Sequence, residues 1–164
     1  MMSKEYFEWD RDFETGNKLI DKQHYSLVEV INELIKIDLN KDSDAFKKIE
    51  VINHKLSKYT LNHFQSEEDL MEKYDVDQRH VKAHKKMHQE FIDKVKQICT
   101  NIDWLVDVEK MSDIVEYLIR WLAYHILNTD KSLFKQIEYI EKEGCSSSEA
   151  YDKEVQIIEC ATEP

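Results

Sequence analysis

The sequence predicts an all-α protein, an up-down-up-down antiparallel four-helix bundle. Among its 164 residues are only 2 Gly and 1 Pro, and the Pro is the last residue. Turns and strand breaks are built largely from these two residue types, so their scarcity favours long helices joined by short polar loops. Apolar residues also recur every three or four positions along four stretches, as on one face of an amphipathic helix.

Each element is predicted from its local pattern. Residues 1–18 lack helical periodicity and are predicted to form an aromatic arm before the first helix, with Trp9, Phe13 and Gly16 in it. Helices follow from Leu19, with breaks at 40–44, 74–77 and near 101–107. Their apolar stripes are His24, Leu27, Val28, Ile31, Leu34 and Ile35, then Phe46, Ile49, Ile52, Leu56, Tyr59, His63, Glu67 and Leu70, then Val81, His84, His88, Phe91, Val95 and Ile98, and finally Met111, Ile114, Val115, Leu118, Leu122, His125 and Ile126.

A short C-terminal segment is expected from Leu133 to Ile140, which completes one domain of residues 1–142. Residues 143–164 are interpreted as a weakly ordered acidic tail, because Ser146, Ser147 and Ser148 follow Gly144 as in a linker.

The composition excludes several classes of partner. The net charge of −11 disfavours nucleic acid and anionic lipid. No apolar run approaches the roughly 18 residues that a membrane span needs. The three cysteines are odd in number and lack metal-binding spacing, so we expect reduced thiols and a cytoplasmic protein.

Five of the seven histidines lie on the apolar stripes: His24, His63, His84, His88 and His125. A buried imidazole nitrogen without a partner costs about 1–3 kcal/mol. A single buried histidine is usually satisfied by a carbonyl or carboxylate, so a plain bundle with structural histidines is an alternative. However, each of the four helices contributes at least one of the five, and a metal ion would satisfy them together.

The spacing of these residues supports a metal site. His63 and Glu67 are four residues apart, as are His84 and His88, so each pair lies about 40° apart on one helix face. Asp130 follows His125 by five residues, which rotates it about 140° away on a regular helix. Asp130 would point inward only if the helix ends or widens near Asn128.

The type of ligand narrows the choice of metal. Imidazole with a few carboxylates suits iron, zinc, copper or nickel. Five histidines and two acids are too many for one tetrahedral zinc ion, whereas two metals sharing carboxylates account for the number. Ferritin-like di-iron proteins use Glu-x-x-His motifs, and none occurs in this chain, which disfavours iron storage or substrate oxidation.

Four motifs in order, at residues 20–24, 63–68, 84–91 and 121–130, resemble those of the hemerythrins and more closely the bacterial hemerythrins. The resemblance covers residues from about 7 to 140. It implies that one iron is bound by His84, His88 and His125, and the other by His24 and His63. Glu67, Asp130 and an oxo or hydroxo group would bridge the two non-haem iron ions.

The resemblance also implies an apolar oxygen pocket, for which the candidates are Val28, Phe64, Trp121 and Leu122, although each is equally well explained as core. The chain departs from the family at 75–77, which replaces the usual Tyr-Pro turn. His80 and His84 form a second pair four residues apart, so His80 could replace His84 or His88 as a ligand. We prefer His84 and His88 because Phe91 then follows as the motif requires, whereas His54 is interpreted as a surface residue.

The function that the resemblance implies is reversible dioxygen binding by a non-enzymatic carrier, storage or delivery protein. An oxygen or redox sensor that acts on a protein partner or signalling module is the main alternative. A di-iron enzyme handling peroxide or nitric oxide is a further one.

Overall fold

The computed structural model describes residues 6–100 and 108–162, with the side chains of 6–97 and 110–157. Every regular element in these ranges is helical, and no strand occurs in them, which confirms the predicted all-α class. The predicted turn near 101–107 lies outside the described residues, and the side chains of Ile98, Cys99 and Cys160 lie outside the described side chains; Cys145 is a free thiol. None of the described helices combines the length and apolarity that crossing a membrane requires.

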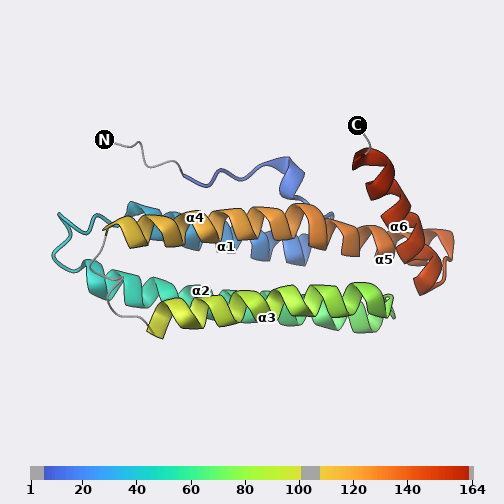
Figure 1. The fold of residues 1–164 in the computed structure, drawn as a ribbon, viewed down its shortest axis with the longest axis horizontal. Helices are drawn as coiled ribbons and strands as arrows, with labels where there is room; N and C mark the ends of the chain where they lie inside the picture. Colours follow the sequence, from blue (N-terminus) through green and yellow to red (C-terminus); the bar gives the residue numbers. More distant parts are fainter. Residues whose placement is uncertain (1–5, 101–107, 163–164) are drawn as a thin grey trace.

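Four long helices lie side by side, with α1 and α4 in one layer and α2 and α3 in the other (Figure 1). A π-helical turn, η3, joins α4 to α5, which extends beyond the four-helix body, and α6 packs across α5 (Figure 1). The bounds are α1 Lys18–Lys36, α2 Ala45–Lys73, α3 Gln78–Thr100, α4 Val108–Tyr124, η3 His125–Asp130, α5 Lys131–Glu143 and α6 Ser147–Thr162.

The segment before α1 is held against that helix by polar and aromatic contacts. The Phe7 amide donates to Asn32 Oδ1 and the Asn32 amide donates back to the Phe7 carbonyl, both at 2.9 Å. The Trp9 ring lies 5.6 Å from Phe13 and 5.9 Å from Tyr25. A short 3-10 helix, η1 (Arg11–Phe13), lies in this segment. Asn17 then caps α1 by accepting from the first amides of the helix.

Residues with a left-handed backbone conformation, that is with positive φ, form the sharp turns next to the helices. Gly16, with φ +88°, precedes α1, and Gly144, with φ +69°, ends α5. Asp75, with φ +48°, takes the same role after α2, where the Val76 amide donates to the Met71 carbonyl at 3.0 Å. The segment 75–77 therefore closes the α2–α3 turn without the expected proline.

The apolar core has two parts, and the buried polar residues described below separate them. The larger lies among α1, α2, α3 and α4, and the smaller comprises Met71, Val76, Leu133 and Ile137. The predicted stripe of α2 is wrong at Phe46 and Tyr59, which are 54% and 40% exposed. Thr60 is buried instead, because the buried face of α2 runs from Leu56 to Thr60, four residues later, and then to His63.

The predicted weakly ordered tail forms a helix in the structure. Ser146 and Glu149 form a capping box, in which the Ser146 amide donates to Glu149 Oε2 at 2.8 Å and the Glu149 amide donates to Ser146 Oγ at 3.4 Å. The serine run therefore starts α6 and is not a linker. Ala150 is fully buried where α6 meets α5.

Candidate metal centre

The structure brings all seven predicted ligand residues together in the buried layer between the two parts of the core. Each is 2% exposed or less. One comes from α1, two from α2, two from α3 and two from η3; in chain order they are His24, His63, Glu67, His84, His88, His125 and Asp130.

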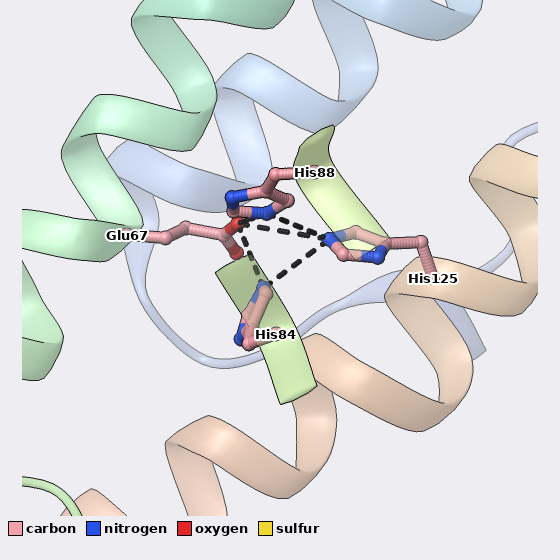
Figure 2. A group of neighbouring side chains, drawn as sticks. All are labelled: Glu67, His84, His88 and His125. Atoms are coloured by element: carbon pink, nitrogen blue, oxygen red, sulfur yellow. Dashed lines mark hydrogen bonds and ion pairs between the residues drawn. The ribbon is translucent and has the colours of Figure 1, made fainter. Parts of the chain in front are cut away.

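Three imidazoles and one carboxylate form the first cluster (Figure 2). Nε2 of His125 lies 3.3 Å from Nε2 of His84 and 3.2 Å from Nε2 of His88. Oε2 of Glu67 lies 3.3 Å, 3.2 Å and 3.8 Å from the Nε2 atoms of His84, His88 and His125. Figure 2 shows the three rings and the carboxylate pointing toward one another. We call these residues the three-histidine cluster.

Two imidazoles and two carboxylates form the second cluster: His24, His63, Glu67 and Asp130. His24 Nε2 lies 3.1 Å from Asp130 Oδ2, and His63 Nε2 lies 3.5 Å from Glu67 Oε2. We call this set the two-histidine cluster. Glu67 belongs to both clusters, and the other oxygen of Asp130 lies 3.0 Å from His125 Nε2, so both carboxylates face both clusters.

The π-helical turn explains how Asp130 reaches the site. Hydrogen bonds in a π-helix join residues five apart, so a residue five positions on returns above the first. His125 and Asp130 are the first and last residues of η3, and both side chains are fully buried. The helix therefore widens near Asn128, which is one of the two ways in which the sequence allowed Asp130 to point inward. Asn128 turns outward, and its side-chain amide donates to the Tyr124 carbonyl at 3.0 Å.

The unsatisfied atoms of the site fit a bound metal. Within the described part of the chain, neither nitrogen of His24 and neither carboxylate oxygen of Glu67 or Asp130 has a hydrogen-bond partner. Nε2 of His63 also lacks one. Buried polar atoms in folded proteins are almost always paired, so this concentration of unpaired donor atoms is unusual. Imidazole nitrogen and carboxylate oxygen are the ligands that iron takes, and cations between them would satisfy the group.

Burial and neighbouring charges set the protonation of the metal-free site. Burial, reinforced by His24 for His63 and by His84 for His88, lowers both pKa values well below the usual 6.5. Burial and the nearby Asp130 raise the pKa of Glu67 well above 4.5. Burial, the largest single influence, opposes ionisation of Asp130 too, but His125, His24 and His84 together outweigh it and lower the pKa of Asp130. In the metal-free site His63 and His88 are thus neutral imidazoles, as metal ligation requires, whereas burial of His125 is outweighed by Asp130 and Glu67, which raise its pKa. Glu67 carries a proton that a metal would displace.

Two residues that are not candidate ligands contact the Nδ1 atoms of His63 and His88, the ring nitrogens that face away from the clusters. Gln23 Oε1 lies 3.3 Å from Nδ1 of His63, and Glu68 Oε1 lies 3.5 Å from Nδ1 of His88. Such contacts fix the tautomer and the orientation of a metal-binding imidazole.

His80 is the residue whose position the sequence left most open. It is buried beside His84 and belongs to neither cluster, whereas His84 and His88 both belong to the three-histidine cluster. Gln136, on α5, contacts His80 and had no signal in the sequence. The sequence feature that pointed to His80 as a residue near the site was its four-residue spacing from His84. His54 is exposed.

Three of the four candidate oxygen-pocket residues line a small apolar cavity of about 10 Å³. These are Phe64, Trp121 and Leu122; Val28 is buried in the same part of the core but does not line it. The Phe64 ring stacks on His88 at 3.7 Å, and the Trp121 ring stacks on His125 at 4.4 Å. Aromatic rings thus cover the core side of the three-histidine cluster.

Comparison with known proteins agrees with this geometry. Residues 15–137 match the family model described as the hemerythrin HHE cation binding domain. A bacteriohemerythrin of Pseudomonas aeruginosa is 39% identical over 122 residues, covering 74% of this chain and 75% of that protein. A bacteriohemerythrin of Stenotrophomonas maltophilia is 30% identical over 79% of this chain and 80% of its own length. The myohemerythrin of Sipunculus nudus is 27% identical over 76% and 88%.

Proposed function

This chain belongs to the hemerythrin family, and we propose that it binds dioxygen reversibly at two non-haem iron ions held in the buried centre. The observation that carries the proposal is the pair of clusters that share Glu67. Two sites of four buried donors each, with a common carboxylate, suit a pair of metal ions better than one.

The proposed ligand assignment follows the two clusters. His84, His88 and His125 would hold one iron, and His24 and His63 the other. Glu67 and Asp130 would bridge them, together with an oxo or hydroxo group. With one imidazole fewer, the two-histidine cluster leaves a ligand position for dioxygen, and reversible dioxygen binding is the chemistry that the iron pair supplies.

The surrounding residues would keep the site dry. Phe64 and Trp121 cover imidazoles from the core side, and Leu122 completes the apolar wall. An apolar wall raises the energy of separated charge and excludes water, both of which favour release of unchanged dioxygen over oxidation of the iron. We further propose that α1 to α4 run in alternating up-down-up-down directions, and that these helices and the docked N-terminal arm form the frame of the site.

Anaerobic loading with ferrous iron followed by exposure to air tests the proposal. We expect about two irons per chain, and an optical absorption that appears in air and disappears when oxygen is removed. Steady turnover of a reductant with peroxide or nitric oxide would instead identify an enzyme. A single metal ion, or none, would contradict the di-iron assignment.

A sensor function is a second candidate, favoured by the position of α6. Arg79 Nη1 binds Asp152 of α6 at 2.8 Å, and its guanidinium lies over the Tyr151 ring at 4.1 Å. Arg79 directly precedes His80, so α6 is attached next to the site. Hydrogen exchange of residues 147–157 in the deoxygenated and oxygenated protein distinguishes the two roles, because a sensor requires a difference there and a carrier does not.

A further inference from the structure

A buried hydrogen-bonded pair lies directly behind the three-histidine cluster. Nε2 of His80 lies 3.1 Å from Nδ1 of His84, the ring nitrogen of His84 that faces away from the cluster. His80 is 7% exposed and His84 is fully buried, so bulk water does not compete for this bond. One of the two nitrogens must carry the proton and the other must accept it.

Gln136 extends the pair by one more residue. Its Nε2 lies 3.0 Å from Nδ1 of His80, and 3.4 Å from both the carbonyl and the hydroxyl oxygen of Ser132. Gln136 is 1% exposed, and its Oε1 has no hydrogen-bond partner within the described residues. A buried amide oxygen without a partner is a costly arrangement, and rotation of the amide would bring it to His80.

In the metal-free arrangement the hydrogen bonds run toward the cluster. With the Gln136 amide nitrogen facing His80 Nδ1, the amide would donate to that nitrogen, so His80 would carry its proton on Nε2 and donate to His84 Nδ1. His84 then carries its proton on Nε2, 3.3 Å from both Glu67 Oε2 and Asp130 Oδ1. This direction is incompatible with a metal on His84, because a neutral imidazole that ligates through Nε2 holds its proton on Nδ1.

We propose that His80 and Gln136 form a relay that reverses direction when His84 Nε2 binds a metal, and that they act as positioning residues for the three-histidine cluster. In the reversed state His84 Nδ1–H donates to His80 Nε2. His80 Nδ1–H then donates to Gln136 Oε1, which the rotated amide brings into its place. This inference rests on the proposed metal at His84.

The proton count of the pair is the same in both directions. The proton on His80 Nε2 passes to His84 Nδ1. The proton on His84 Nε2 leaves to solvent as that nitrogen becomes a ligand, and His80 Nδ1 takes up one proton from solvent, so release and uptake cancel. Each imidazole therefore carries one proton before and after. The reversal gives Gln136 Oε1 a donor and moves Nε2 away from the two Ser132 oxygens that lie 3.4 Å from it in the metal-free state.

Nitrogen NMR of histidine-labelled full-length protein tests the reversal directly, with zinc as a diamagnetic probe that binds the same ligand types. We expect His80 to be protonated on Nε2 without metal and on Nδ1 once zinc is bound. Bound zinc with an unchanged His80 tautomer would overturn the inference alone. Failure of zinc to bind would overturn the proposed function together with it.

Two substitutions at His80 separate positioning from packing. His80→Leu removes the acceptor, and we expect the three-histidine cluster to bind metal about 10–100-fold more weakly while the other metal binds as before. His80→Gln restores an acceptor and is expected to recover most of the affinity. His54→Leu, at an exposed histidine, is the matched control. Equal weakening at both metals, or no rescue by glutamine, would show that His80 is only a packing residue.

Discussion

At the scale of single residues, Glu67 is the ligand that belongs to both clusters of the site. Its Oε2 lies within 3.5 Å of His63 on one side and of His84 and His88 on the other. It is fully buried, and neither oxygen has a hydrogen-bond partner in the described part of the chain. A carboxylate in this position is expensive to bury without a cation, so its retention in the core points to the metal sites.

Replacing Glu67 by glutamine is expected to weaken both metal sites. Gln keeps the shape but removes the negative charge and turns one shared oxygen into a donor. Each site should lose more than the roughly 10-fold that follows loss of an outer partner. Iron content after competition with a chelator measures the effect. Glu72→Gln, at an exposed position of α2, is the control, and a fully loaded Glu67→Gln protein would contradict the shared role.

At the scale of elements, regular helical spacing accounts for what the sequence could predict. The pairs His63–Glu67 and His84–His88 lie on ordinary helices, and the structure places each pair in the site. Asp130 required a π-helical turn, whose position depends on packing around η3 and not on residue periodicity. Gln136 could not be found at all, because its contact with His80 spans 56 residues and depends on where α5 lies.

The C-terminal helix shows a different limit of sequence interpretation. A serine run after a glycine suggests a linker, but Ser146 and Glu149 in capping-box spacing begin a helix. Ser147 and Arg79 then fix α6 to the α2–α3 turn, through the Asp75 carbonyl at 2.5 Å and Asp152 at 2.8 Å. These partners are about 70 residues apart along the chain, so local pattern did not reveal them.

Ala150 offers a test of whether α6 docks as a separate element. It is fully buried, so Ala150→Leu should overpack the α5–α6 contact and destabilise docking by about 1–3 kcal/mol. We expect faster hydrogen exchange over residues 147–157, with α1 to α3 and the iron content unchanged. Ala83→Leu, at an exposed position of α3, is the control. Loss of protection throughout the bundle would show that α6 belongs to the same cooperative unit.

At the scale of the whole molecule, the buried polar layer makes the stability of the metal-free protein depend on pH. Burial lowers the pKa of His63 and His88 well below 6.5 and that of His80 to about 3. Below about pH 6.5 the unfolded chain therefore binds protons at these positions that the folded chain does not bind. The state that binds more protons is favoured by acid, so these three groups destabilise the fold as the pH falls.

Glu67 affects the pH dependence of folding stability in the opposite direction from the three histidines. Because its pKa in the folded protein is raised above 4.5, the folded chain holds a proton there that the unfolded chain releases. Between about pH 4.5 and 6.5 Glu67 opposes the three histidines, and near the upper end of this window so does His125, whose burial is outweighed by Asp130 and Glu67, which raise its pKa above 6.5. With two groups against three, the unfolded chain still binds more protons overall. The free energy of unfolding of the metal-free protein should therefore fall on acidification through this window.

Urea unfolding of the metal-free protein at several pH values from about 6.5 to 5 measures this dependence. The expected slope is about 1.4 kcal/mol per pH unit for each net proton. His80→Gln should flatten the slope, because it removes one of the three histidines, whereas His54→Gln should not, because His54 is exposed. Iron should steepen the slope, since ligation displaces the proton on Glu67 and keeps the bound imidazoles unprotonated in the folded chain, while the unfolded chain still takes up protons. Stability that rises on acidification would mean that the buried carboxylates, and not the histidines, dominate the proton balance of the fold.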